Sequence, residues 1–183
     1  MEQNKAIILD RDGVLIEDKN YSYKIEDLEI LPGVIEGLKL LQTKFLFFIV
    51  TNQSGIGMGY YTVKEFQIYN DHLIFLLKKH DIHIQKTFFC PHLKEENCEC
   101  RKPNPQYLFE IRDGWGIDLK SSWVFGDHPS DIIFGINGGC KTVYMVTGHG
   151  EKHLKELESQ NIKPNLISSK FFIAAKRIHE ISD

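Results

Sequence analysis

The stretch Ala6-Ile7-Ile8-Leu9-Asp10-Arg11-Asp12-Gly13 decides the fold, because an uninterrupted apolar run ends in two acidic residues and a glycine. Side chains two apart on an extended segment point the same way, so Asp10 and Asp12 would project together from the end of a buried strand. Carboxylates this close repel each other unless a cation or a proton reduces their charge. The pair indicates either a polar turn after a strand or a divalent-cation site in which one carboxylate attacks and the other moves protons.

The length and composition are those of one ordinary globular domain. A chain of 183 residues can bury a full hydrophobic core, so we expect a single domain over residues 1–183. The 42% hydrophobic and 26% charged fractions fit this class. A net charge of -3 gives no overall attraction to nucleic acid or to a membrane surface, so we expect neither partner, and any anion site must be built locally.

The sequence also bears on location and assembly. No stretch approaches the roughly 18 apolar residues of a membrane span. The first residues lead directly into Lys5 and a strand, so we expect no signal peptide and a cytoplasmic protein. Nothing in the pattern requires more than a monomer.

Short apolar runs alternate with helical patterns along the chain. This alternation predicts an α/β fold with a parallel sheet. The predicted strands are Ala6–Leu9, Phe45–Val50, Lys86–Phe89, Ser122–Phe125, Thr142–Val146 and Leu166–Ile167. The predicted helices are Val34–Gln42, a long helix from the capping box Thr62/Glu65 to about Lys79, Pro105–Asp113, Ser130–Asn137, His149–Ser159 and a C-terminal helix that opens at Ser168 or Ser169.

Polar residues gather where the predicted strands end. Ligands of open α/β sheets bind outside the carboxyl ends of the strands. Thr51–Gly55 combines hydroxyls, amides and a glycine that suit a phosphate, and Gly126-Asp127 is followed by Asp131. Arg101-Lys102 precedes a predicted helix. Each segment alone also fits a turn, a helix cap or a solvated surface charge. Together they supply a nucleophile, metal ligands, a phosphate cradle and a cation, and this combination indicates phosphoryl transfer.

A polar loop at residues 90–101 interrupts the alternation. Cys90, His92, Cys98 and Cys100 supply three thiolates and an imidazole, the donor set of a closed structural zinc site. A short loop with little apolar content cannot bury a core, so metal binding would supply its order. The alternative is two reduced thiols and a disulfide, which is unusual in a cytosolic chain. Because Arg101-Lys102 follows directly, we expect the zinc loop to aim these cations at the phosphate. Cys140 lies apart, and we expect it in the core or a turn.

Four motifs carry a resemblance to a known superfamily. Ile-Leu-Asp-Arg-Asp-Gly (8–13), Val-Thr-Asn-Gln-Ser-Gly (50–55), Arg-Lys-Pro (101–103) and Gly-Asp-x-x-x-Asp (126–131) resemble the motifs of the haloacid dehalogenase-like (HAD) phosphatases. The match runs from about Ile7 to Gly148. With Cys-Pro-His…Cys-x-Cys before Arg-Lys-Pro, the chain looks most similar to the zinc-containing D,D-heptose 1,7-bisphosphate phosphatases and the related histidinol-phosphatases. The resemblance implies a three-layer Rossmann-like HAD fold, and the short stretch between the first two motifs leaves no room for a large cap domain.

The resemblance also implies roles for the acidic residues. Asp10 would attack phosphorus and form an aspartyl-phosphate. Asp12 would protonate the leaving alkoxide and later take a proton from the hydrolytic water. Mg²⁺ would be held by Asp10, the backbone carbonyl of Asp12 and Asp127. Asp131 would be either an acid behind these ligands or a residue of the helix start.

Polar and basic residues would hold a small phosphorylated metabolite. Thr51 and Lys102 would contact the transferring oxygens, where negative charge spreads in the transition state. The other residues that we expect to bind substrate are Asp18, Lys19, Asn20, Tyr21, Asn52, Gln53, Ser54, Arg101 and His128. Lys19-Asn20 departs from the residues common in the heptose branch.

One further departure concerns the residue after Asp127. The heptose branch usually has lysine there, whereas this chain has His128. Histidine titrates near neutral pH, so we expect His128 to face the phosphate but to contribute less at alkaline pH. The substitution weakens the assignment to heptose bisphosphate. Of the other histidines, only His149, between two glycines at a strand end, is a candidate for the mouth of the site.

Three functions compete at this point. The favoured one is a Mg²⁺-dependent phosphatase of a small sugar phosphate. The resemblance favours a D-glycero-D-manno-heptose 1,7-bisphosphate 7-phosphatase, with a histidinol-phosphatase as the alternative, because both branches share the zinc loop and the catalytic motifs. A signalling receiver also uses Asp, Thr and Lys with Mg²⁺, but its phosphorylated Asp follows a middle strand and not the first. A non-catalytic binding module of the same fold would typically have lost Asp10 or Asp12, and both are present.

Overall fold

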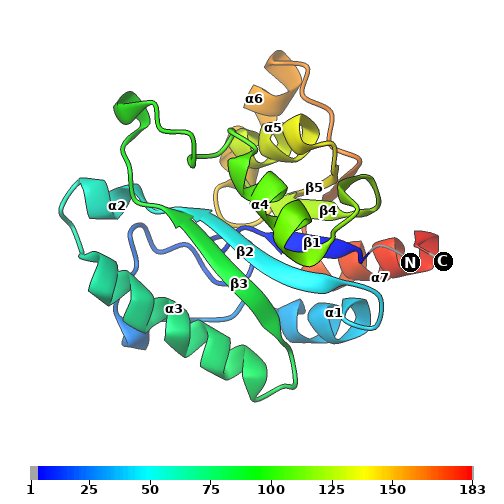
Figure 1. Cartoon of the computed structure of the whole chain (residues 1–183), viewed down its shortest axis with the longest axis horizontal. Helices are drawn as coiled ribbons and strands as arrows, with labels where there is room; N and C mark the ends of the chain where they lie inside the picture. The colour runs from blue at the N-terminus through cyan, green and yellow to red at the C-terminus, as the bar shows by residue number, and fades with distance from the viewer. Residues whose placement is uncertain (1–3, 183) are drawn as a thin grey trace.

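A six-stranded parallel sheet forms the centre of the computed structural model, which describes residues 4–182. The strands lie in the order β3-β2-β1-β4-β5-β6, so the chain starts in the middle, runs to one edge and then returns to fill the other side (Figure 1). Their bounds are β1 (Ala6–Leu9), β2 (Leu46–Asn52), β3 (Ile84–Cys90), β4 (Trp123–Gly126), β5 (Lys141–Met145) and β6 (Leu166–Ser168).

Helices cover both faces of the sheet and make three layers, as the sequence predicted. Figure 1 shows α1, α3 and α7 below the sheet and α4, α5 and α6 above it. The helices are α1 (Val34–Leu41), the short α2 (Ser54–Gly57), α3 (Val63–Lys78), α4 (Gln106–Trp115), α5 (Pro129–Gly138), α6 (Gly150–Ser159) and α7 (Phe171–Ile181), with 3₁₀ turns at Ile25–Asp27, Lys94–Glu96 and Leu119–Ser121.

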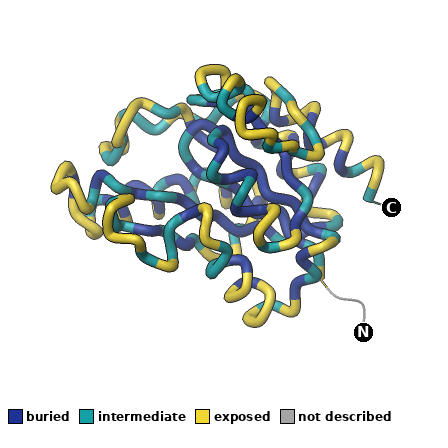
Figure 2. The backbone as a smooth tube through the Cα atoms, turned by 90° about the horizontal axis from the view of Figure 1, so that it is seen from above, coloured by how far each residue is buried: buried dark blue, intermediate teal, exposed yellow. Residues whose placement is uncertain are grey.

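The side chains of β1 divide the core into its two layers. Ile7 and Leu9 face the layer that contains α1, α3 and α7, whereas Ala6 and Ile8 face the residues of α4 and α5. All four side chains are fully buried, which explains why the strand reads as an unbroken apolar run. Burial declines outward from this centre to the loops (Figure 2).

The predicted elements agree with the structure except in three places. The C-terminal helix was expected to open at Ser168 or Ser169, but α7 begins at Phe171 after an N-cap at Lys170, and Ser168 is the last residue of β6. Strand β1 has the predicted bounds, and the bounds of the other strands differ by one or two residues. Helix α2 was not predicted, because its residues overlap the segment that we interpreted as a phosphate-binding loop. Its four residues also show no helical spacing of apolar side chains. Strand β3 was predicted from a short apolar run, but its residues Gln85 and Lys86 are polar and exposed, since β3 is an edge strand.

The topology places one end of the sheet at a reversal of the strand order. The chain leaves β1 toward β2 on one side, and β4 pairs with β1 on the other, so the loops after these three strands meet. Between β1 and β2 the described chain contains only one 3₁₀ turn and α1, which fits the expected lack of a large cap domain.

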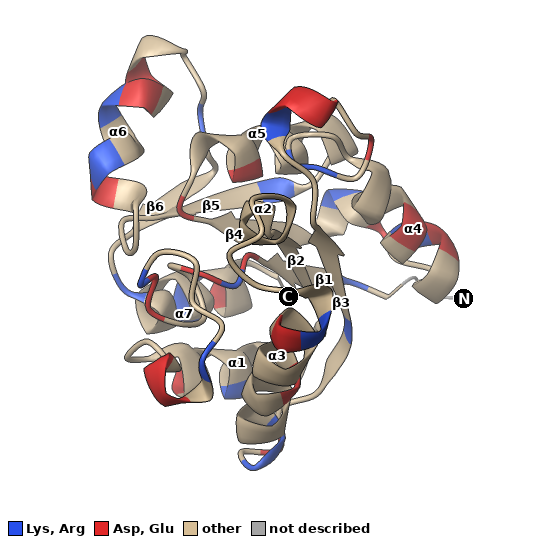
Figure 3. Cartoon of the chain, turned by 90° about the vertical axis from the view of Figure 1, so that its left-hand side faces the viewer, with Lys and Arg blue, Asp and Glu red and all other residues tan. Residues whose placement is uncertain are grey.

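Basic and acidic residues are interspersed along α6 (Figure 3). Within residues 4–182 no helix is long and apolar enough to span a membrane.

Candidate active site

A pocket of about 260 Å³ opens where the loops after β1, β2 and β4 meet. It is lined by Asp10, Arg11, Asp12, Asp18, Asn20, Tyr21, Ser22, Thr51, Asn52, Gln53, Ser54, Tyr61, Arg101, Lys102, Asp127, His128, Ser130, Asp131 and His149. The sequence-predicted catalytic, magnesium and substrate residues are therefore brought together, with the exception of Lys19. The side chain of Lys19 instead lies 3.5 Å from Glu29, where an opposite charge attracts it.

Lys102 connects two acidic residues at the floor of the pocket. Its Nζ lies 2.8 Å from Asp10 Oδ1 and 2.7 Å from Asp131 Oδ1, and it donates to the carbonyl of Val50 at 2.8 Å. These three acceptors use all three N–H groups of the ammonium. Burial alone would lower the pKa of Lys102, but the two carboxylates outweigh it and raise the pKa, so the side chain stays charged. The ammonium is thus fixed beside the expected nucleophile.

Asp131 has a definite place in this arrangement. Its Oδ2 accepts the backbone N–H of His128 at 3.0 Å, which closes a capping box at the start of α5. Its Oδ1 holds Lys102. Gly126 makes room for it, because a Cβ there would lie 2.0 Å from the Cβ of Asp131. Both roles that the sequence left open, helix start and supporting acid, are combined in one side chain.

Asp127 sits in a cradle of two glycines. Its Oδ2 accepts the backbone N–H of His149 at 2.8 Å. A Cβ at Gly13 would come within 2.2 Å of that oxygen, and a Cβ at Gly148 within 2.4 Å. Both glycines have positive φ angles, which other residues rarely adopt. The carboxylate can therefore reach the pocket only because both positions lack side chains.

The donor set fits a hard divalent cation. Carboxylate oxygens of Asp10, Asp127 and Asp131 lie within 4.8 Å of one another. Burial raises the pKa of Asp10 to about 7 and of Asp127 to about 9, and Lys102 lowers that of Asp10 only partly. Crowded buried carboxylates with one ammonium between them carry unbalanced negative charge, which an ion of the Mg²⁺ type would neutralise through oxygen ligands.

Asp12 is held by its neighbours away from Lys102. Arg11 donates from Nε to Oδ2 and from Nη2 to Oδ1 of Asp12, both at 3.1 Å. Gln53 Nε2 donates to the same Oδ2 at 2.9 Å. The side chain of Asp12 stays 21% exposed toward the pocket, whereas Asp10 is more buried and pairs with Lys102. Asp10 and Asp12 lie only two residues apart, yet their carboxylates have different surroundings. Different chemical roles for the two residues would require such a difference.

The residues after β2 differ in what they contact. Thr51 is buried, and its Oγ1 accepts a hydrogen bond from Gln53. Asn52 exchanges two hydrogen bonds with the backbone of Lys102, which fixes that residue. The hydroxyl of Ser54 accepts from Arg101 at 2.8 Å. Gln53 and Asn52 were predicted to bind substrate. Both line the pocket, but their side-chain amides form hydrogen bonds with protein groups.

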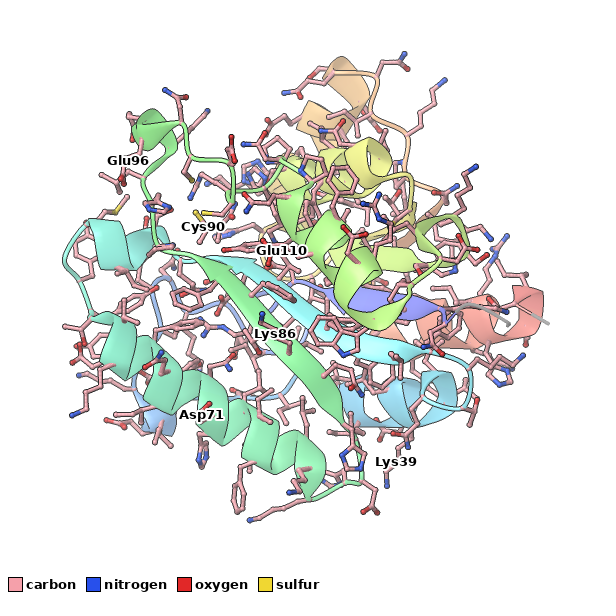
Figure 4. All side chains as sticks on the ribbon, in the orientation of Figure 1. Lys39, Asp71, Lys86, Cys90, Glu96 and Glu110 are labelled. Atoms are coloured by element: carbon pink, nitrogen blue, oxygen red, sulfur yellow. The ribbon has the colours of Figure 1, made fainter. Side chains whose placement is uncertain are left out.

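The cysteine loop has the geometry of a tetrahedral metal site. The Sγ atoms of Cys90 and Cys98, and those of Cys98 and Cys100, are 3.5 Å apart, while His92 Nδ1 lies 3.3 Å from Cys100 Sγ and 3.7 Å from Cys90 Sγ. Zinc–sulfur bonds of about 2.3 Å at tetrahedral angles separate two sulfurs by about 3.8 Å. Figure 4 shows sulfur atoms gathered beside Cys90 at the end of β3. The four cysteines are free thiols, so the alternative with a disulfide is wrong.

The cysteine loop is tied to the pocket by Arg101. Its Nη1 donates to the carbonyl of His92 at 3.1 Å as well as to Ser54. A cation that holds the loop on one side and the end of β2 on the other would transmit the order of the metal site to Lys102, the next residue. Cys140 is separate from the cluster and buried in the core under α4, as predicted.

The segment after β1 supplies the outer wall of the pocket. Asn20 and Tyr21 both have positive φ, so the chain turns sharply there, and Tyr21 packs edge-on against Tyr60. Asp18 Oδ2 lies 3.1 Å from Nδ1 of His149, which links this wall to the start of α6. His149 therefore does line the mouth of the site, and the two glycines that flank it were the only signal in the sequence.

His128 lines the pocket, but not as the cation that the sequence suggested. Its Nδ1 accepts the backbone N–H of Ser130 at 3.2 Å and so caps α5. Burial lowers the pKa of the imidazole, against the pull of Asp131, which favours the neutral form. The ring of His153 lies tilted against that of His128, with ring centres 4.5 Å apart, and its Nδ1 lies 2.8 Å from Glu156 Oε2. A ring whose Nδ1 accepts a hydrogen bond carries its proton on Nε2, so these contacts account for the His128–His153–Glu156 cluster without a metal.

Four pocket residues were missed in the sequence. Arg11 lies inside the first motif but was not given a role, Ser22 and Tyr61 were not singled out for the pocket, and Ser130 was seen only as a helix start. Arg11 offered the one usable signal, because an arginine between two acidic residues at the end of a buried strand must find partners.

Comparisons with known proteins agree with this geometry. A family model described as HAD-hydrolase-like matches residues 99–171. A D-glycero-α-D-manno-heptose-1,7-bisphosphate 7-phosphatase from Campylobacter jejuni is 43% identical over 79% of this chain and 83% of its own length. A D-glycero-β-D-manno-heptose-1,7-bisphosphate 7-phosphatase from Helicobacter pylori is 39% identical over 79% of this chain and 84% of its own.

Two further relatives widen the comparison. The histidine biosynthesis bifunctional protein HisB of C. jejuni is 35% identical over 85% of this chain, which spans 44% of that protein. A crystal structure of D,D-heptose 1,7-bisphosphate phosphatase from B. bronchiseptica, complexed with magnesium and phosphate, superposes with a TM-score of 0.86 at 28% identity and covers 96% of this chain and 98% of its own. The chain therefore belongs to the HAD-like phosphatases, in the family of the heptose bisphosphate phosphatases.

Proposed function

We propose that this protein is a D-glycero-D-manno-heptose-1,7-bisphosphate 7-phosphatase that works through an aspartyl-phosphate. The observation that carries the proposal is the unequal pair after β1. Asp10 pairs with Lys102 and is 13% exposed, while Asp12 pairs with Arg11 and is 21% exposed toward the pocket. A nucleophile beside a fixed ammonium and an acid/base in reach of the leaving group are what phosphomonoester hydrolysis needs.

In the first half of the reaction, Asp10 attacks phosphorus. A bond forms between the Asp10 carboxylate and phosphorus, the bond from phosphorus to the sugar oxygen breaks, and Asp12 gives its proton to that oxygen. Lys102 and the hydroxyl of Thr51 stabilise the charge that spreads over the transferring oxygens. An alkoxide is a poor leaving group, so the proton from Asp12 matters most in this step.

In the second half, water attacks the aspartyl-phosphate. Asp12, now a carboxylate, takes a proton from the water, phosphate leaves, and Asp10 is restored. Asp10, the backbone carbonyl of Asp12 and Asp127 would hold Mg²⁺. When bound, the ion would neutralise the phosphate and the buried carboxylates. The Cys90–Cys100 cluster would hold a structural zinc that keeps Arg101 and Lys102 in place.

Histidinol phosphate is the second candidate substrate. The similarity to HisB supports it, and neutral His128 in place of the usual lysine of the heptose branch removes one cation that a bisphosphate would favour. The heptose relatives have the higher identity and match over most of their own length, which supports the bisphosphate.

Steady-state kinetics decide between the substrates. We expect Mg²⁺-dependent release of one phosphate from heptose 1,7-bisphosphate, with kcat/KM at least about tenfold above that for histidinol phosphate. The Asp10→Asn variant is the control and should release none. Equal activity of wild type and Asp10→Asn would contradict the phosphatase, and a preference for histidinol phosphate would replace the substrate.

A further inference from the structure

The carboxylate of Asp12 is held by a fixed set of donors. Both its oxygens accept from Arg11, and Oδ2 accepts a third hydrogen bond from Gln53. Paired contacts from the planar guanidinium fix the plane of a carboxylate as well as its position. The orientation of Asp12 is therefore set before any substrate arrives.

Gln53 has no hydrogen-bonding capacity left for substrate. Its Nε2 donates to Asp12 and to Thr51 Oγ1 at 2.8 Å, and its Oε1 accepts from Arg11 at 3.2 Å and from Tyr61 at 2.6 Å. These are the two N–H groups and two lone pairs of an amide. A flipped amide would set its oxygen against a carboxylate and its NH₂ against a guanidinium, so only one orientation is possible.

The guanidinium of Arg11 is itself immobilised. The side chain is 1% exposed, and its central carbon lies 5.1 Å from the ring centre of Phe66 and 5.0 Å from that of Tyr69. Both rings belong to α3, so the helix clamps the cation by cation–π contact. Burying a charged side chain costs free energy unless partners compensate for the lost hydration. The hydrogen-bond partners of Arg11 are Asp12 itself and Gln53, which also donates to Asp12.

We infer that Arg11 and Gln53 are positioning residues that aim Asp12 at the leaving-group oxygen, an inference that rests on the proposed function. They act through Asp12 and do not touch the reacting atoms. Gln53 also leaves Thr51 its hydroxyl proton to donate to the phosphate, because its own N–H already fills a lone pair of Oγ1.

This role predicts a dependence on the leaving group. An alkyl phosphate needs a proton from Asp12 as its oxygen departs, whereas 4-nitrophenolate leaves without one. The variants Arg11→Lys and Gln53→Met should therefore lower kcat/KM for heptose bisphosphate about 100-fold, in the range of one general acid, and that for 4-nitrophenyl phosphate by less than about threefold. Because kcat/KM covers the steps up to departure of the alcohol, hydrolysis of the phosphoenzyme does not enter.

The surface pair Arg112–Asp113 provides a matched control. Arg112 makes the same two-bond contact with the next residue, at 2.7 and 3.0 Å, but in solvent. Arg112→Lys should leave both substrates unchanged, and Asp12→Asn should reproduce the leaving-group pattern of the two test variants. Circular dichroism verifies folding, and if Arg11→Lys does not fold, Gln53→Met decides alone.

The outcomes separate the inference from the proposed function. Suppose that wild type hydrolyses both phosphates. If the variants then lose activity toward both substrates to the same extent, or keep full activity toward both, Arg11 and Gln53 do not position Asp12. A wild type that hydrolyses neither phosphate contradicts the proposed function itself.

Discussion

Gly13 and Gly59 have nearly the same backbone conformation but very different surroundings. Their φ angles are 77° and 74°. A Cβ added to Gly13 would meet Asp127 Oδ2 at 2.2 Å, whereas a Cβ on Gly59 would find no atom within 4 Å. The two positions therefore separate the cost of a left-handed backbone from the cost of displacing Asp127, the proposed Mg²⁺ ligand.

Alanine at each glycine tests this difference. Gly13→Ala and Gly59→Ala should each destabilise the fold by about 1–2 kcal/mol through backbone strain. Gly13→Ala should in addition lower kcat/KM by at least about 100-fold, because Asp127 must move out of the pocket. Thermal unfolding and phosphate release measure the two effects. Equal activities of the two variants would show that Asp127 does not depend on the space at Gly13.

At this scale the sequence predicted the acidic residues but not their partners. Asp10, Asp12 and Asp127 follow apolar strands, and a strand end is a local signal. The contact of Arg11 with Gln53 joins residues 42 apart. No pattern around either residue encodes that distance, because it depends on the register of β1 beside β2.

The loop from Cys90 to Arg101 has no hydrophobic core of its own, and in the proposed zinc site four ligand atoms would order it. Its one short turn, Lys94–Glu96, contains no buried residue. Arg101 joins the loop to Ser54, and Asn52 holds the backbone of the next residue, Lys102. The loop therefore connects a candidate metal site to the cation of the active site.

Removal of one thiol should uncouple this loop from the domain. Cys98→Ser should reduce bound zinc from one per chain, measured by elemental analysis, and lower kcat/KM by about tenfold or more, as loss of a supporting metal contact does. The melting temperature should change little, because the core lies elsewhere. Cys140→Ala, which removes a thiol outside the cluster, should keep both zinc and activity. Full activity of zinc-free Cys98→Ser would contradict the coupling.

Among the elements, those with their own signals were predictable. The capping box of α3 forms as expected, with Thr62 and Glu65 bonded reciprocally. The short helix α2 exists because Gly55 and Gly57 let it pack closely: a Cβ on Gly55 would lie 2.4 Å from the ring of Tyr61, and one on Gly57 2.9 Å from the carbonyl of Pro91. Such tertiary contacts leave no periodicity in the sequence.

Asp10, Asp127 and Asp131 lie close together, and the ammonium of Lys102 pairs with only two of them, Asp10 and Asp131. Burial and mutual repulsion raise the pKa values of Asp10 and Asp127, so their charged forms are destabilised in the folded chain. A cation that binds only the folded state stabilises it by mass action. Metal binding and folding are therefore linked.

Thermal unfolding with and without Mg²⁺ tests this linkage. At about 100 times its Kd, Mg²⁺ should add about 2.7 kcal/mol, which raises Tm by roughly 5–10 °C in a domain of this size. Burial raises the pKa of Asp127 to about 9, so near neutral pH the metal-free chain must take up a proton there on folding. Asp127→Asn keeps the side-chain shape but does not ionise, which removes this cost. This variant should melt above wild type when metal-free and should not respond to Mg²⁺. A Tm response to Mg²⁺ in Asp127→Asn equal to that of wild type would exclude Asp127 as a ligand.

The overall architecture was more predictable than the arrangement within it. Alternating strands and helices require a layered parallel sheet, and the first motif required β1 to be buried on both faces. The order of the strands in the sheet could not be predicted from the sequence. All the predicted strands are short apolar runs, so nothing in their patterns tells which strand lies beside which. The single domain over residues 1–183 extends beyond the described residues 4–182 at both ends, and it remains a prediction, as does the monomer.

Helix α7 and strand β1 lie at opposite ends of the described chain but share one core. Phe171 of α7 stacks on Phe125 of β4. A Cβ on Gly37 of α1 would lie 2.6 Å from the ring of Phe171. Ala174, Ala175 and Ile178 complete the same layer as Ile7 and Leu9. During synthesis on the ribosome, α1 and α3 can cover this layer of β1 early, but the part that α7 fills stays open until α7 emerges. The enzyme cannot acquire its final packing co-translationally before that point, so nascent chains halted short of α7 would present this apolar face to chaperones.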